Sequence, residues 1–111
     1  MRNTLAAFLL GSLPLPALHA ALISSSGSGG FTVGSTWTGG SVPGSGDSPQ
    51  IGAGHTVTFN GTATIDGAEI GHNGVPSGNG TLDLVGGTLT ASGADNFDLG
   101  LGATTGVLNI T

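Results

Sequence analysis

Residues 80–90, which read Gly-Thr-Leu-Asp-Leu-Val-Gly-Gly-Thr-Leu-Thr, contain two short strand-like runs separated by a pair of glycines. Apolar and polar side chains alternate within each run, which is the period of a β-strand and not of a helix. The first run recurs behind a glycine at a spacing of 26 residues, at 55–59, 81–85 and 107–111. A fixed period of this size is typical of a solenoid, in which each coil buries its apolar face against its neighbours.

Two further runs recur together with the first. Residues 62–66 have their counterpart at 88–92, again 26 residues on, and residues 69–71 have theirs at 98–100, at a spacing of 29. The three extra residues belong to a longer loop at 93–95. Three short strands per unit, separated by glycine turns, predict an all-β, three-sided parallel β-helix of about two and a half coils.

The strand period also separates the side chains that face the core from those that face solvent. Outward residues of neighbouring coils are expected to form ladders at the strand spacing of about 4.8 Å. The expected inward residues are Val57, Phe59, Leu82, Leu84, Leu108 and Ile110 on the first side, and Ala63, Ile65, Leu89 and Ala91 on the second. The expected outward residues are Thr58, Asp83 and Asn109 on the first side, and Thr62 and Thr64 stacked with Thr88 and Thr90 on the second.

The first 20 residues have the order of features found in a secretory signal peptide. Arg2 is followed by the apolar run 5–13, then by Pro14 and Pro16, and Ala20 offers a cleavage site. The apolar run is shorter than the roughly 20 residues that a membrane-spanning helix needs. We therefore predict a secreted or cell-surface protein, cleaved after Ala20, with no membrane span of its own.

The mature chain is expected to have three parts. Residues 21–30 are rich in serine and glycine and are predicted to be a flexible lead. Residues 31–54 are predicted to cap the N-terminal end of the solenoid, with Phe31 and Trp37 over its core. Residues 55–111 are the β-helix repeats. A parallel coil ending at Thr111 without a cap would leave open strand edges, so the chain is expected to be a fragment or a truncated gene model.

Composition narrows the function classes. The chain has one Lys or Arg, which is Arg2, and six Asp and Glu, so its formal charge is −5. Cleavage after Ala20 removes Arg2 and leaves six acidic residues against no Lys or Arg, a charge of −6. Nucleic acid and anionic lipid are thereby excluded as partners, since both are bound through cations. Cysteine is absent, which excludes disulfides and thiolate metal sites.

The sequence predicts no catalytic, cofactor-binding or metal-binding residues. Two histidines without a partner at fixed spacing, His55 and His72, are poor candidates for a zinc site. Glycoside hydrolysis needs two carboxylates about 5–10 Å apart. The available carboxylates are Asp66, Glu69, Asp83, Asp95 and Asp98.

Two other features are open to a second interpretation. Trp37 could be a platform for stacking on a sugar. The Thr-x-Thr pairs resemble the flat arrays of ice-binding proteins.

The chain resembles secreted bacterial β-helix proteins, and most of all those with autotransporter-associated β-strand repeats. Residues 37–47 and 51–57 are similar to the entry segment of such proteins, and residues 80–90 and 99–110 are similar to their repeats. The resemblance implies an exported, elongated, non-enzymatic scaffold at the cell surface, of the adhesin or passenger kind. Its expected partners are further β-helix coils of the same protein and a surface polysaccharide or host-cell ligand.

A different function stays open. The chain could instead be the N-terminal part of a β-helix enzyme that acts on polysaccharides, with its catalytic coils beyond Thr111. Clustered Asp with Lys or Arg on successive coils would indicate the enzyme, and further glycine repeats with an anchor would indicate the scaffold.

Overall fold

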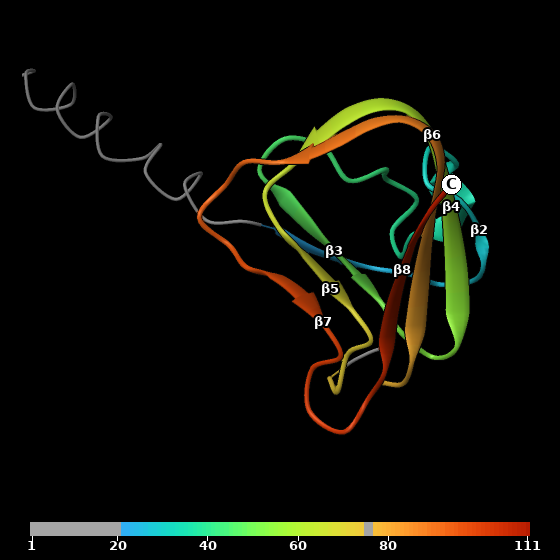
Figure 1. The fold of residues 1–111 in the computed structure, drawn as a ribbon, viewed down its shortest axis with the longest axis vertical. Coiled ribbons are helices and arrows are strands. Elements are labelled where there is room, and N and C mark those ends of the chain that lie inside the picture. Colours follow the sequence, from blue (N-terminus) through green and yellow to red (C-terminus); the bar gives the residue numbers. More distant parts are fainter. Residues whose placement is uncertain (1–20, 75–76) are drawn as a thin grey trace, which may run out of the picture.

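The computed structural model describes residues 21–74 and 77–111, which form an all-β parallel solenoid of about three turns (Figure 1). The predicted signal peptide, residues 1–20, lies outside the described residues. The strands form two parallel sheets, in the orders β1-β3-β5-β7 and β2-β4-β6-β8. Their bounds are β1 Ala21–Ser24, β2 Gly29–Gly30, β3 Asp47–Ile51, β4 His55–Ile65, β5 Ala68–Ile70, β6 Gly80–Ala91, β7 Phe97–Leu99 and β8 Gly106–Ile110.

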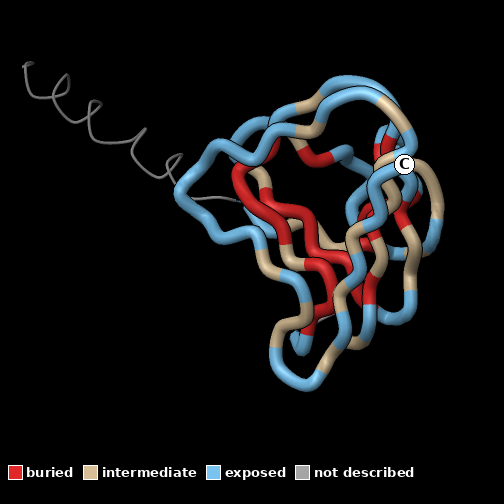
Figure 2. Tube along the Cα trace, in the orientation of Figure 1, coloured by how far each residue is buried: buried red, intermediate tan, exposed pale blue. Residues whose placement is uncertain are grey.

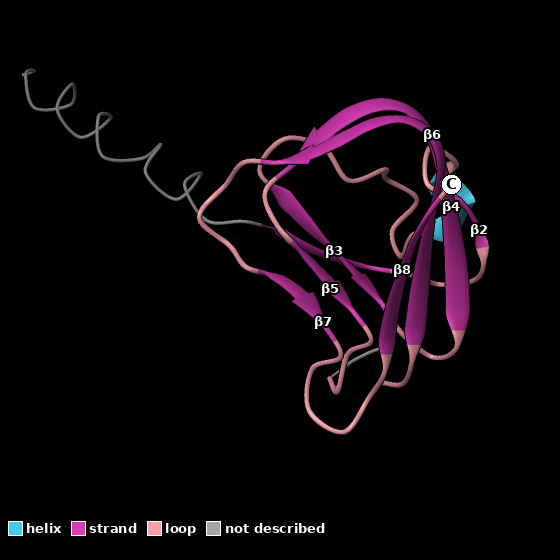
Figure 3. Ribbon diagram, in the orientation of Figure 1, coloured by secondary structure: helices cyan, strands magenta, loops and turns pink. Residues whose placement is uncertain are grey.

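The prediction of a three-sided parallel β-helix is confirmed, although two of the three sides share one sheet. Strands β4 and β6 are 11 and 12 residues long, and each bends across a corner so that it covers both the first and the second side (Figure 3). Strands β3, β5 and β7 form the third side. The pairing of Glu69 with Asp98 confirms the predicted offset of 29 there.

Glycine makes the corner between the first two sides possible. Gly87 has a φ of +81°, which side chains rarely adopt, and a Cβ at this position would overlap the carbonyl oxygen of Gly61 in the coil below. The two glycines are register partners. The sequence suggested separate strands on either side of this glycine, whereas the ladder of hydrogen bonds continues through it.

The spacing of 26 is wrong for the first side of the first repeat. His55 pairs with Gly80 and Phe59 with Leu84, an offset of 25, whereas Asn60 pairs with Gly86, an offset of 26. Val85 is therefore an extra residue, a β-bulge at the corner. The smaller offset keeps Phe59 and Leu84 on the same face, since a slip of one residue would turn one of them outward.

Residues 21–30 are not a flexible lead, because they supply the first strands of the solenoid. β1 pairs with β3 from Ala21 to Ser24, and β2 pairs with β4 through Gly29 and Gly30. The parallel ladders give the backbone of this glycine- and serine-rich segment its hydrogen-bond partners. The expected cap, 31–54, is also too long, because its last part contains β3, a strand of the third side.

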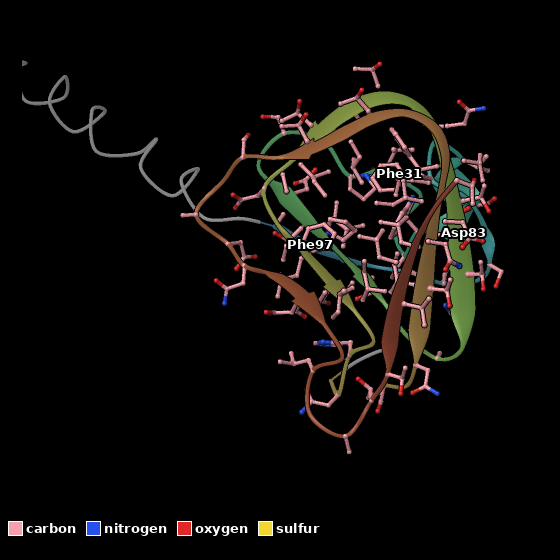
Figure 4. The ribbon with its side chains drawn as sticks, viewed as in Figure 1. Phe31, Asp83 and Phe97 are labelled. Carbon is pink, nitrogen blue, oxygen red and sulfur yellow. The ribbon has the colours of Figure 1, made fainter. Side chains whose placement is uncertain are left out.

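The N-terminal end of the solenoid is closed by two aromatic side chains. Phe31 makes edge-to-face contacts with Trp37 and Phe59, at centroid distances of 5.3 and 5.2 Å. Both Phe31 and Trp37 are buried, and the Trp37 indole Nε1 donates a hydrogen bond of 2.7 Å to the carbonyl oxygen of Phe31. Figure 4 shows Phe31 inside the triangle that the three sides outline.

A short antiparallel segment, residues 36–38, pairs with the chain at the end of β1, from Ser24 to Ser26, and we name it the strap. The Ser26 amide donates to the Thr36 carbonyl and the Thr38 amide donates to the Ser24 carbonyl, each at 2.8 Å. The strap begins at Thr36, the last residue of a single 3-10 turn, Gly34–Thr36. The part of the β1 edge that is paired in this way offers fewer unpaired backbone groups to another strand.

Burial falls from the N-terminal to the C-terminal end of the core (Figure 2). On the third side, Ile51 and Ile70 are buried and their register partner Leu99 is 50% exposed. On the first side, Phe59 is buried and Ile110, two coils above it, is 73% exposed. The described residues therefore form a solenoid with a closed N-terminal end and an open, apolar C-terminal end.

Candidate functional site

The outer face of the third side carries a polar cluster that links successive coils. Ser24, Gln50, Glu69 and Asp98 are successive register partners on β1, β3, β5 and β7. Each lies next to an inward apolar residue, so strand alternation turns these four side chains outward. We name this set the third-side column.

Hydrogen bonds link three coils along this column. Ser24 Oγ donates to Gln50 Oε1 at 3.0 Å, and Gln50 Nε2 donates to Glu69 Oε1 at 2.8 Å. His72 Nδ1 lies 2.7 Å from the same Glu69 oxygen, an ion-pair contact whose N–H direction falls outside hydrogen-bond geometry. Gln50 is 5% exposed and His72 is 9% exposed. Glu69 is thus held by neighbours on two sides.

Asp98 differs from Glu69 in its surroundings. It is the register partner of Glu69 on the last strand of the third side, and among residues 21–74 and 77–111 no side chain or amide pairs with its carboxylate. Strand spacing places the two carboxylates on neighbouring strands of one face. Glu69 and Asp98 are thus two of the predicted acidic residues that the fold places in register.

A second ladder joins coils on the outer face of the first side. Thr58, Asp83 and Asn109 are register partners, and Asn109 Nδ2 donates to Asp83 Oδ1 at 2.6 Å. Figure 4 shows Asp83 outside the triangle. The outward placement of these three residues, which strand alternation predicts, is confirmed.

The threonine ladder on the second side is also confirmed. Thr62 pairs with Thr88 and Thr64 with Thr90, and all four residues are exposed. No charged residue stands between them in either strand. The result is a small, uncharged array of hydroxyl and methyl groups.

The remaining acidic residues lie at the corner between the second and third sides or in a neighbouring turn. Asp95 Oδ2 accepts a 2.7 Å hydrogen bond from the buried Ser48 hydroxyl, whose oxygen accepts from the Gly67 amide at 3.2 Å. Asp66 is buried at this corner, and a Cβ at Gly93 would overlap its carboxylate. At the start of β3, Asp47 Oδ2 accepts a hydrogen bond of 2.8 Å from the Gly44 amide in the preceding turn.

His55, a poor candidate for a zinc ligand, and Trp37, a possible sugar-stacking platform, both make structural contacts. His55 Nδ1 lies 2.8 Å from Ser25 Oγ, but Ser25 is buried and its oxygen also accepts from the Gly52 amide. Trp37 is 2% exposed, which contradicts its interpretation as a sugar-stacking platform. Within the described ranges, no group of three His, Asp or Glu side chains is arranged to hold a metal ion.

Sequence reasoning missed Ser24 and Gln50, the two uncharged members of the third-side column. The available signal was their spacing, because they lie 26 residues apart, the period of the repeat. The serine- and glycine-rich composition of residues 21–30 hides this signal, because it predicts a flexible lead and not a strand.

No family model, curated protein sequence or solved structure matches this chain. A search of the described residues for a helix that is long and apolar enough to cross a membrane finds none.

Proposed function

We propose that this chain is part of an exported, non-enzymatic structural protein of the extracellular space or cell surface, with adhesion as its role. One observation carries the proposal. Three of the carboxylates are engaged in contacts that join separate coils or corners: Gln50 holds Glu69, Asn109 holds Asp83 and Ser48 holds Asp95. Carboxylates held in this way support a scaffold better than they support turnover, which needs an acid and a base free to exchange protons.

Export belongs to the same proposal. Cleavage after Ala20 would leave Ala21 as the first residue, and Ala21 pairs with Asp47 in the ladder between β1 and β3. The released chain would then start directly with a strand of the solenoid. The absence of Lys and Arg after Arg2 favours neutral or cationic partners, such as uncharged surface polysaccharide, over anionic ones.

The test is to express the full chain in a bacterial host and follow it. We expect the protein outside the cytoplasm with Ala21 at its N-terminus, and we expect beads coated with it to bind cells or cell-wall polysaccharide. No release of sugar ends should accompany binding. A protein that stays in the cytoplasm with Met1 intact would contradict the export claim, and coated beads that bind no better than albumin-coated beads would contradict adhesion.

The polysaccharide-active enzyme remains a second candidate, because Glu69 and Asp98 are neighbours in register. Under that hypothesis, Glu69→Gln and Asp98→Asn would each abolish release of sugar ends from a polysaccharide that the parent protein cleaves. Asp83→Asn, on another side of the solenoid, is the matched control. A parent protein without activity on a broad polysaccharide panel would count against the enzyme.

Ice binding is the third candidate, favoured by the four exposed threonines in register. Replacing Thr64 and Thr90 together by lysine would then abolish thermal hysteresis, whereas the same change at Thr58, which lies outside the array, would leave it intact. A parent protein that produces no thermal hysteresis would exclude this candidate.

A further inference from the structure

The two ends of the solenoid differ in their ability to accept another strand. At the N-terminal end the strap hydrogen-bonds to the free edge of β1, and Phe31 and Trp37 fill the core. The end of this edge, at Ser24, is therefore already hydrogen-bonded, which disfavours head-to-tail stacking of copies on the third side. At the C-terminal end, β7 is the last strand of its sheet, and Phe97 and Leu99 are 39% and 50% exposed.

In the described coils, two outward carboxylates each accept a hydrogen bond from an amide side chain on a neighbouring coil. Glu69 accepts from the Gln50 amide on the coil before it, and Asp83 accepts from the Asn109 amide on the coil after it. The distances are 2.8 and 2.6 Å. A chain without Lys or Arg after residue 2 neutralises no carboxylate with such a cation, so amides supply charge-assisted hydrogen bonds in their place.

Asp98 is an outward carboxylate that accepts no hydrogen bond from an amide side chain of the described residues. It lies between Phe97 and Leu99 on β7, which face the inside of the triangle, as Figure 4 shows for Phe97. Its neighbour on one side is Glu69, another carboxylate, whose Oε1 accepts a hydrogen bond from Gln50. Two adjacent carboxylates repel, so a donor from the other side of Asp98 would lower the cost of the pair.

We infer that the C-terminal end of the solenoid is a binding surface for one further parallel β-coil, whose third-side strand reads apolar–amide–apolar, with the amide opposite Asp98. The apolar residues cover Phe97 and Leu99, and the amide donates to the Asp98 carboxylate. Strand β3 already shows that this pattern fits the column, because Pro49, Gln50 and Ile51 place an amide between two inward apolar residues. The inference rests on the scaffold proposed above and specifies what stacks on it.

A second copy of this chain joined end to end is the weaker occupant. A two-fold axis would make the strands antiparallel, and an axis through the third side would set Asp98 against its own equivalent. Each copy also carries an excess of acidic residues, so the two would repel one another. The expected partner is therefore a coil of parallel direction, as in every pairing between the strands described here.

The test appends a coil after Thr111 in the full chain. The extension repeats residues 61–71, so that its second-side strand follows β8 and its third-side strand lies over Phe97, Asp98 and Leu99. In the first version glutamine replaces the glutamate of the repeated segment, and in the matched version the glutamate is kept. We expect the melting temperature of the glutamine version to exceed that of the glutamate version by roughly 5–10 °C.

A charge exchange keeps the experiment decisive. Asp98→Asn combined with the glutamate extension restores an amide–carboxylate pair in the opposite sense, so its melting temperature should return to that of the glutamine version. Equal melting temperatures for the glutamine and glutamate versions would overturn the pairing of an amide with Asp98. Extensions that all melt with the unextended chain would overturn the binding surface itself, whereas a failure of export or adhesion would leave these melting temperatures unchanged.

Discussion

Gly87→Ala is expected to remove a large part of the stability of this protein, whereas Gly54→Ala should remove little. The two glycines have almost the same backbone conformation, with φ of +81° and +79°. They differ in the space around them. A Cβ at Gly87 would overlap the Gly61 carbonyl oxygen, whereas nothing lies within 4 Å of a Cβ at Gly54.

The cost of the left-handed backbone conformation, which both glycines share, determines the expected loss of stability in Gly54→Ala. A side chain in the left-handed region costs roughly 1–2 kcal/mol, of which about 0.5–1 kcal/mol returns because alanine has less freedom in the unfolded chain. Gly54→Ala should thus lose about 1 kcal/mol. Gly87→Ala has the same conformational cost. Its Cβ would also force β6 away from β4, and each hydrogen bond lost at the corner would cost about 1 kcal/mol. We expect a loss of ~4 kcal/mol or more, a large part of the roughly 5–13 kcal/mol available to a domain of this size.

Urea denaturation followed by tryptophan fluorescence measures the difference directly. Trp37 is the only tryptophan and is buried in the closed end, so its emission reports on the loss of the folded core. The reasoning would be refuted by equal losses in the two variants, because equality would mean that conformation alone, and not the close approach of the coils, requires glycine at position 87.

Three further predictions concern smaller changes in the free energy of unfolding, each from a single contact or backbone conformation. Trp37→Phe removes the indole donor from the buried Phe31 carbonyl and should cost ~1–3 kcal/mol, whereas Trp37→Ala should cost ~3–5 kcal/mol, both measured by circular dichroism in urea. Ser48→Ala leaves the Gly67 amide and Asp95 without their partner and should cost ~1–3 kcal/mol, and a loss no greater than that of the exposed Ser45→Ala would contradict the contact. Ala53 has a φ of 55°, so Ala53→Gly should raise the melting temperature, by about 0.5–1 kcal/mol of stability, and a fall would show that its left-handed conformation is not strained.

The periodicity of the sequence predicted the architecture because both depend on the same repeated physical requirement. Every coil must place apolar residues at alternate positions over those of its neighbour, so Val57, Phe59, Leu82 and Ile65 could be assigned to the core from the strand period alone. The same alternation placed Asp83 and the four threonines outside. Ala91 and Ile110 follow the inward pattern but are exposed, since no described coil covers them.

The features that the sequence did not predict depend on contacts between segments that are distant in the chain. The bulge at Val85 adjusts the register of two coils, and its position within the repeat follows from matching Phe59 to Leu84, not from the spacing of glycines. Residues 21–30 have the composition of a linker, but their backbone pairs with β3 and β4, which local propensity does not report. The candidate site shows the same limit, because Gln50 gains its role only from the side chains of Ser24 and Glu69 on other coils.

The strap and the aromatic pair at the N-terminal end have a consequence for how the chain acquires its structure. In a solenoid, coils can form one after another, each using the previous coil as a template. Contacts that close the N-terminal end, such as that of Trp37 with Phe31, lie within residues 24–59 and need no later coil. Since synthesis delivers these residues first, we expect ordering to begin there and to advance coil by coil, with each new edge exposed only until the next strand arrives.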